Sequence, residues 1–286
     1  MAVIKLMNLP TGLKLTRKQK EILELIYKYR FLNRIQIQAF LKHKDYKTIN
    51  LWLKDLRAKH YLEWIYSTNF TEKTKPAIYY LGINGIRYFK NSDSYPTDEL
   101  RKRYREPSRS QTYIDRCLLL VDCCLTLSTT RDDYNWYFFE TEADYQKDSY
   151  YHFLMDNESG IHPHLCFSKD IYEGGASEPT IEHSYLLEIF DATLPRYRIK
   201  KRLSNYVNYL DQEEDDWEES SEDDNLPIIL MVCPRTTDLI YAKRRTRGLL
   251  AEVWEHDDED RPHIRFTTAE KLRQFGILAD EIWEEA

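Results

Sequence analysis

Residues 45–57 place apolar side chains at helical spacing, and this pattern most constrains how the neighbouring chain can fold. Ile49, Leu53 and Leu56 predict one buried stripe, and Asp45 is a favourable N-cap. The other faces of the predicted helix carry Tyr46, Lys47, Asn50, Lys54 and Arg57. Such a helix packs one side against a core and exposes a basic, polar side. Taken alone, an ordinary amphipathic helix with a solvated face is the simpler interpretation.

Two shorter helices are predicted before this stretch, and a β-hairpin is predicted after it. Thr16 is a suitable N-cap for an apolar stripe that ends near Arg30, and Asn33 can cap a second helix over residues 34–41. Residues 61–66 alternate like a strand, and residues 77–81 read as the returning strand. Three short helices joined by tight turns indicate a helix-turn-helix core followed by a hairpin.

The charge of the chain is divided unevenly along its length. Residues 1–92 carry 18 Lys and Arg against 6 Asp and Glu, a net of +12. Residues 93–286 carry 23 against 42, a net of −19, which hides the basic region within a whole-chain charge of −7. Nucleic-acid affinity depends on the local density of cations, so the first third suits a DNA partner despite the acidic total.

The predicted helices and hairpin resemble a winged helix-turn-helix domain, and residues 79–86 look like its last strand running into a closing helix. In that family the third helix enters the major groove and the wing contacts the backbone or the minor groove. The resemblance implies DNA binding by Tyr46, Lys47, Asn50, Lys54, Arg57, Lys73 and Lys75, with Thr68 and Asn69 also on the wing. An Asn can read adenine, although one on a helix surface is more often only solvated. A protein-docking module is the alternative, and the net charge of +12 disfavours it.

Residues 93–110 contain Pro96 and Pro107, five Lys and Arg residues and no apolar periodicity. They are predicted to be a linker. The cations could follow a phosphate backbone, or they could simply belong to a solvated tether.

The remaining residues, 111–286, alternate between helical and strand patterns. Helices are predicted at 113–127, 196–209, 241–254 and 268–275, and strands at 136–139, 164–167, 185–190, 226–232 and 263–266. The continuous apolar strand at 226–232 is of the kind buried on both faces. The acidic run 211–224 is predicted to be a solvated loop, with an autoinhibitory segment as the alternative. Together these elements indicate an α/β core.

This order resembles the restriction-endonuclease-like core, and the whole chain resembles the plasmid replication-relaxation family, which joins a winged helix to such a core. The resemblance lies in residues 187–193, 202–206 and 266–283. The predicted fold class is therefore α+β, with a winged helix-turn-helix domain at 1–92, a linker at 93–110 and a nuclease-like domain at 111–286.

A nuclease of this fold needs carboxylates at the ends of adjacent strands to hold Mg²⁺, and a lysine near the attacking water. Glu188, Asp191 and Lys200 are the candidates. However, Phe190 stands where the family often has a second acid, and His164 follows Pro163 where an aspartate is usual. We therefore expect no catalysis and no metal cofactor; Mg²⁺ belongs only to the alternative of a metal-dependent DNA endonuclease or nickase of the PD-(D/E)XK type.

Other candidate sites are weaker. His162, His164 and Cys166 could supply only an uncertain metal site, and residues 174–177 read as a glycine-rich loop without phosphate-binding spacing. The five cysteines show no Cys-x-x-Cys pair, and no apolar run reaches about 18 residues, so the expected location is the cytoplasm, with no membrane partner.

The sequence thus predicts a DNA-binding accessory or regulatory protein of a plasmid or other mobile element, acting in replication, relaxation or transcription control. Its expected partners are double-stranded DNA, a relaxase or replication protein, and a second copy of the chain. The alternatives are the endonuclease and a protein-docking scaffold that retains no DNA.

Overall fold

The protein is an α+β chain in the computed structural model, which describes residues 15–66, 74–92, 95–130, 135–144, 160–171, 180–217, 226–254 and 262–286. It divides into two compact units, an N-terminal unit of Met1–Glu106 and a C-terminal unit of Pro107–Ala286. None of the described helices is both long enough and apolar enough to cross a bilayer.

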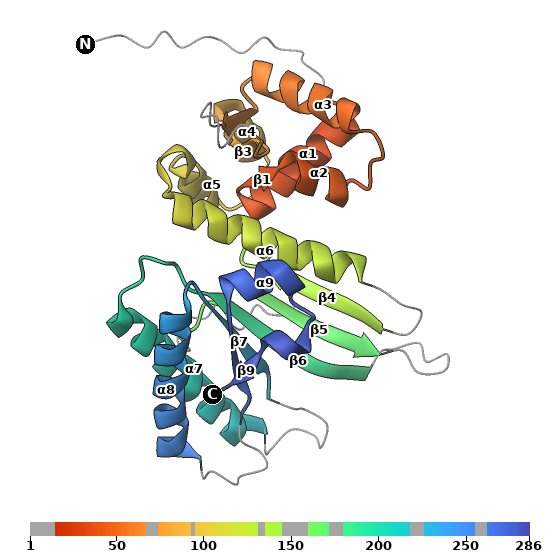
Figure 1. Cartoon of the computed structure of the whole chain (residues 1–286). Coiled ribbons are helices and arrows are strands. Elements are labelled where there is room, and N and C mark those ends of the chain that lie inside the picture. Colours follow the sequence, from red (N-terminus) through yellow and green to blue (C-terminus); the bar gives the residue numbers. More distant parts are fainter. Residues whose placement is uncertain are drawn as a thin grey trace, which may run out of the picture. The chain divides into compact units, whose positions relative to one another are not determined.

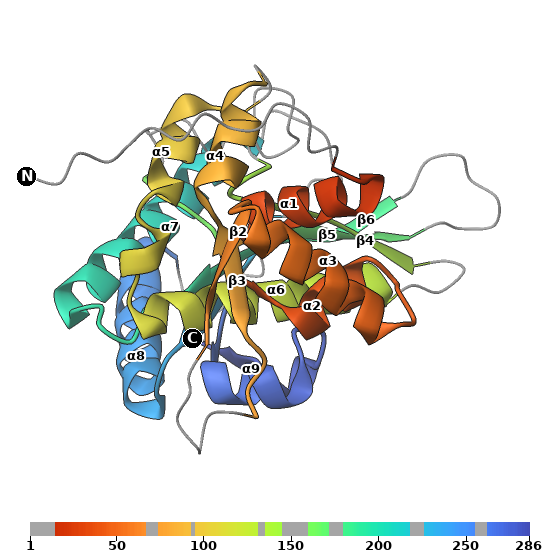
Figure 2. The same ribbon diagram turned by 90° about the horizontal axis from the view of Figure 1, so that it is seen from above.

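The N-terminal unit has the predicted three helices and hairpin. Its elements are α1 (Arg17–Tyr29), β1 (Leu32–Asn33), α2 (Arg34–Phe40), α3 (Tyr46–Ala58), β2 (Leu62–Ile65), β3 (Ile78–Leu81), α4 (Ile83–Lys90) and α5 (Thr97–Arg103). The three strands form an antiparallel sheet in the order β1-β3-β2, and Figure 2 shows β2 and β3 side by side, close to α1 and α3. The predicted N-caps are confirmed, because Thr16, Asn33 and Asp45 each accept backbone hydrogen bonds from the first turn of their helix.

The closing helix α4 packs against the turn that follows α3. The backbone carbonyl of His60 lies 2.5 Å from the position that a Cβ on Gly82 would take, and the carbonyl of Tyr61 lies 2.4 Å from that of Gly85. Only glycine allows this approach, because a real Cβ would overlap the carbonyl oxygens. The side chain of Asn84 then donates to the carbonyl of Lys59 at 2.8 Å, which fixes the start of α4 at the base of the hairpin.

The range predicted to be a linker contains α5, which belongs to the N-terminal unit. Leu100 and Arg103 are buried, and the guanidinium of Arg103 donates to the carbonyl of Tyr27 at 3.0 Å. Arg30 pairs with the fully buried Glu106 at 2.6 Å. The sequence prediction took this basic stretch for a solvated linker. An arginine can nevertheless pack its aliphatic stem against apolar groups while its guanidinium keeps polar partners.

The C-terminal unit is a six-stranded sheet with helices on both faces. Its elements are α6 (Gln111–Thr129), β4 (Asn135–Thr141), β5 (Leu165–Ile171), β6 (Thr180–Ile189), α7 (Arg196–Trp217), β7 (Ile228–Cys233), α8 (Thr236–Val253), β8 (Ile264–Thr268), α9 (Ala269–Phe275) and β9 (Glu284–Glu285). The strand order follows the sequence, β4 to β9; β6, β7 and β8 are mutually parallel, and the other neighbours are antiparallel.

The core lies on both sides of β7, as its continuous apolar sequence predicts. Ile229, Met231 and Cys233 pack with α7 and α8, which lie side by side in Figure 1. Ile228, Leu230 and Val232 alternate with these residues and are also buried, on the opposite face of the sheet. On that face α9 contacts β7, and α6 contacts α9. This sheet brings the carboxyl ends of β6, β7 and β8 to one edge.

Several boundaries differ from the sequence prediction, among them the start of β6 at Thr180, the end of β5 at Ile171 and one boundary each of α7 and α8. Helix α7 continues to Trp217, so the first seven residues of the acidic run are helical; residues 218–225 lie outside the described range. Gln and Glu are good helix formers, and this explains the continuation. Helix α8 begins at Thr236, five residues before the predicted start at Tyr241.

Candidate functional site

The exposed side of α3 is basic and polar, as the sequence predicts. Lys47, Asn50 and Lys54 are exposed, and Tyr46 and Leu51 keep 51% and 64% of their surface accessible. Ile49, Leu53 and Leu56 are buried on the opposite side, in the core of the N-terminal unit. Within the described ranges, the ammonium groups of Lys47 and Lys54 form no ion pair. The face is therefore open to an anionic partner.

The two carboxylates of α3 and its cap both have local hydrogen-bond partners. Asp45 accepts hydrogen bonds from the backbone of Lys47 and Thr48 and from the Thr48 hydroxyl, and these bonds hold the pKa of Asp45 below its usual range. Asp55 accepts from the ammonium of Lys59 at 2.7 Å and from the amide of Gln19 at 2.6 Å. Among the described residues, neither acid forms an ion pair with Lys47 or Lys54.

Arg57 lies where the sequence prediction did not place it. Its guanidinium is 3.3 Å from the centre of the Trp64 ring in β2, so it packs between α3 and the hairpin rather than on the exposed face. Trp64 in turn stacks on Tyr66 at 5.4 Å, and both rings remain partly exposed. These two aromatic residues were treated only as strand positions in the sequence.

The wing itself is described only in part. Lys75 is exposed at the start of the returning chain. Thr68, Asn69 and Lys73 lie outside the described residues. At the other end of the helix, the guanidinium of Arg34 in α2 lies 5.6 Å from the Tyr46 ring, which extends the cationic surface from α3 onto α2.

In the C-terminal unit, the structure places Glu188 inside the core. Only 1% of its surface is exposed, and it faces α7, where it pairs with the guanidinium of Arg202 and accepts from the Tyr206 hydroxyl at 3.0 Å. Burial raises the pKa of Glu188, while Arg202 and Tyr206 oppose that rise. Arg202 is thus the cation that pairs with this carboxylate, while Lys200, the lysine of the candidate nuclease set, is exposed on α7.

His164 lies beside this pair without joining it as a cation. Its Nδ1 is 4.0 Å from Glu188 and accepts a hydrogen bond from the backbone N–H of Ile189 at 3.2 Å. A nitrogen that accepts cannot also carry the proton, so the ring is neutral with Nε2 protonated. Burial, with the nearby Arg116 and Arg202, also holds the pKa of His164 well below its usual range.

Asp191 is turned away from Glu188. It follows the end of β6, where its carboxylate accepts from the backbone N–H of Thr193 at 2.8 Å and from the Thr193 hydroxyl at 2.6 Å. Partial burial raises the pKa of Asp191, but the bonds from Thr193 outweigh this and leave it below its usual range. The predicted set of Glu188, Asp191 and Lys200 is therefore not joined by any contact in the described residues, which also contain no converging group of three His, Cys, Asp or Glu side chains able to hold a metal.

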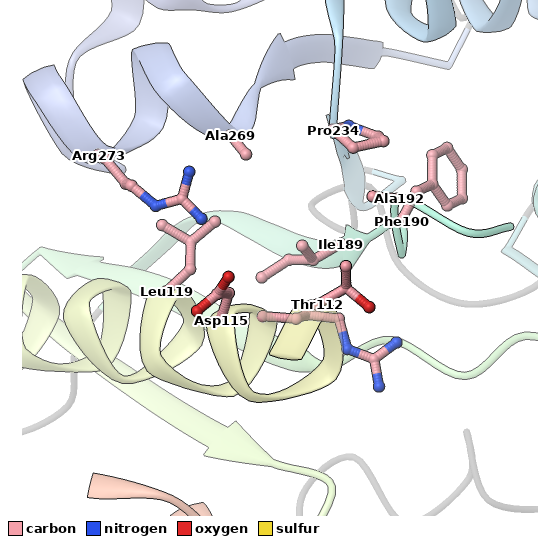
Figure 3. A pocket seen from close by; sticks show the side chains of 10 residues that line it. Thr112, Asp115, Leu119, Ile189, Phe190, Ala192, Pro234, Ala269 and Arg273 are labelled. Carbon is pink, nitrogen blue, oxygen red and sulfur yellow. The ribbon is translucent and has the colours of Figure 1, made fainter. Parts of the chain in front are cut away.

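A small pocket of about 100 Å³ opens at the carboxyl ends of β6, β7 and β8. Figure 3 shows Thr112, Asp115 and Leu119 of α6 along one side and Arg273 of α9 on the other. Ligands commonly bind at this edge of parallel strands. Glu188 is not among the lining residues, so its carboxylate is not presented to the pocket.

These features can be compared with known proteins. No family model, curated protein or solved structure matches the chain. The functional proposal therefore rests on the geometry within each unit and on the resemblance described from the sequence.

Proposed function

We propose that the chain is a DNA-binding protein that holds duplex DNA against the exposed face of α3. The observation that supports this most directly is the placement of Lys47 and Lys54 on one exposed face, where the nearby Asp45 and Asp55 have other hydrogen-bond partners. The element order α1, β1, α2, α3, β2, β3 and the sheet order β1-β3-β2 agree with the expected winged helix-turn-helix domain. In that arrangement α3 is the helix that enters the major groove.

We further propose that the protein acts without cutting DNA, as an accessory or regulatory protein of a plasmid or other mobile element. The pairing of Glu188 with Arg202 supports a non-catalytic C-terminal unit, because a guanidinium occupies the position beside the carboxylate where a nuclease would need a divalent cation. The mobile-element role is carried by the resemblance to the plasmid replication-relaxation family.

DNA binding is tested by measuring the affinity of the full chain for a duplex at several salt concentrations. Lys47→Ala and Lys54→Ala are each expected to weaken binding and to reduce the slope of log K against log salt by about 0.9, since each lysine neutralises one phosphate. Lys20→Ala removes an exposed lysine from α1 and serves as the matched control. An unchanged slope in both α3 variants would remove this helix from the interface.

The endonuclease alternative is separated by incubating the full chain with supercoiled plasmid and Mg²⁺ or Mn²⁺. We expect no nicking. Nicking that disappears in Glu188→Ala would replace our proposal with the enzyme, and failure to retain any DNA would favour a protein-docking scaffold. Recovery of bound fragments from a library of mobile-element DNA would then identify the recognised site.

A further inference from the structure

A second group of exposed cations lies in the C-terminal unit, on α7 and α8. We call it the α7–α8 patch, and it consists of Arg196, Arg198, Lys200, Lys201, Arg244, Arg245 and Arg247. The two helices pack side by side (Figure 1). Tyr241 joins the two halves, because its ring centre lies 5.1 Å from the guanidinium of Arg196 and 5.9 Å from that of Arg245, and its hydroxyl donates to the carbonyl of Arg196 at 3.3 Å.

The patch is unusual because the unit that carries it is strongly acidic. Residues 107–286 contain 19 Lys and Arg against 38 Asp and Glu, a net of −19. Nine of those 19 basic residues fall in 196–202 and 243–247, and neither range contains an acidic residue. With acids twice as frequent as bases, an even distribution would have placed carboxylates among them.

Two basic residues beside the patch form ion pairs with carboxylates, unlike the patch residues themselves. Arg202 pairs with Glu188, and Lys243 pairs with Glu284 at 3.1 Å. In the parts of the chain that the structure describes, none of the seven patch residues forms an ion pair. Like charges held within about one Debye length, 8–10 Å, repel each other, and an anionic partner relieves that repulsion.

We propose that the α7–α8 patch binds the phosphodiester backbone of duplex DNA as a contact surface additional to α3. Five of the seven cations are arginines, which bind phosphate oxygens with two parallel hydrogen bonds. A single strand is less suited, because single-strand sites stack bases on several aromatic rings. The patch offers the exposed ring of Tyr197 and the half-buried ring of Tyr241, and Arg196 and Arg245 already lie over the latter.

A membrane surface fits the patch less well than DNA. Helices that lie on membranes insert an apolar face between the headgroups. Here the apolar faces of α7 and α8, which include Ile199, Leu203 and Leu239, are buried in the core of the unit. The exposed apolar residues of the two helices are Tyr197, Ile240 and Val253, fewer than the seven patch cations, and this favours a mainly electrostatic contact with a regular array of phosphates.

Site-specific photo-crosslinking in the full chain tests where DNA lies. A photoreactive phenylalanine derivative is introduced at Tyr197 or, as the matched control, at Phe275 of α9, which is also exposed at 52%. We expect crosslinks to a labelled duplex from position 197 and none from position 275. Equal crosslinking from both positions, or crosslinking of a single strand alone from position 197, would overturn the inference.

Charge removal gives an independent measurement. The triple variant Arg244→Gln, Arg245→Gln, Arg247→Gln should lower the salt slope of duplex binding by roughly 2 to 3, about 0.9 for each phosphate lost. Arg273→Gln removes an exposed arginine from α9 and should leave the slope unchanged. Combining the triple variant with Lys47→Ala and Lys54→Ala should remove more binding than either set alone.

The outcomes separate this inference from the proposed function. If only the α3 variants weaken DNA binding, the patch is not a DNA surface and the proposed function stands. If only the triple variant does so, the patch binds DNA and the role of α3 fails. If the triple variant loses binding to vesicles containing phosphatidylserine while its DNA binding is unchanged, the inference is wrong and the patch is a membrane contact.

Discussion

The side chain of Glu188 lies inside the C-terminal unit with Arg202 as its ionic partner. Removing one member of a buried pair leaves an uncompensated charge and costs about 3–5 kcal/mol when both groups are buried. Here the guanidinium side keeps 40% of its surface exposed, so part of its contribution is already screened by water. The cost of losing it should be smaller but still measurable.

We therefore predict that Arg202→Met destabilises the protein by about 2 kcal/mol at pH 8. The pKa of Glu188, already raised by burial, should rise further without the guanidinium. Below about pH 4.5 the carboxyl is protonated in both the folded and unfolded states, so the loss should be small there and grow as the pH rises through the folded-state pKa. Denaturant unfolding at pH 5 and pH 8 measures this. Lys201→Met, an exposed neighbour, is the control, and an equal loss at both pH values would contradict the prediction.

Arg57 permits a second prediction, because it separates packing from DNA contact. Its guanidinium stacks on Trp64, and such contacts contribute about 0.5–2 kcal/mol. We expect Arg57→Ala to lower the free energy of unfolding by about 1 kcal/mol and to leave the salt slope of DNA binding unchanged. Lys54→Ala, in contrast, should change the slope and leave the stability nearly unchanged. A reduced slope in Arg57→Ala would return this arginine to the interface.

The same two sites show which residue contacts a sequence can predict. Glu188 stood out as an acid in an apolar strand, but its partner did not, because Arg202 lies in the next helix and the contact depends on how α7 packs on β6. The sequence does show that Arg202 and Tyr206 are four residues apart and so project from one face of a helix, which would allow both to contact the same buried acid. Asp191 lies two residues beyond the end of β6, so strand alternation does not fix its direction relative to Glu188.

At the scale of elements, local chemistry determined what the sequence could predict. N-caps depend on residues only two or three positions apart, so Thr16, Asn33 and Asp45 located their helices correctly. The sequence prediction missed helix α5 because its stabilising contacts are tertiary. Arg103 is buried against Tyr27 of α1, which is distant in sequence. The strand β9 has only two residues and carries no pattern to detect.

The cap of α2 gives a prediction at this scale. Asn33 accepts from the backbone N–H groups of Ile35 and Gln36, and the Gln36 side chain accepts from the Asn33 backbone in return. Asn33→Ala should cost about 1 kcal/mol, because Asn caps are typically worth that much. Asn50→Ala is the matched control, since the same substitution at an exposed position inside α3 removes no cap. If thermal unfolding showed equal shifts for both variants, the cap would not contribute as described.

At the scale of the whole molecule, the two units carry opposite net charges. Under the proposed function, the basic N-terminal unit would attract DNA, and the net −19 of the C-terminal unit would oppose contact outside the proposed α7–α8 patch. Because salt screens both repulsion and attraction, we expect the acidic surface to limit indiscriminate contact with DNA most strongly at low ionic strength.

The last prediction concerns the number of copies on DNA. Winged helices commonly occupy two half-sites about one DNA turn, 34–36 Å, apart, and a two-fold operator then requires a two-fold protein. We predict that two copies of this chain bind one operator, with α3 of each copy in successive major grooves. Light scattering of the free protein and of its complex with a recovered fragment should give the mass of a dimer, and footprinting should show two protected half-sites with centres about 10 base pairs apart. A monomer both free and on DNA, with a single protected half-site, would exclude this arrangement and leave one copy of α3 to provide all of the specific contacts.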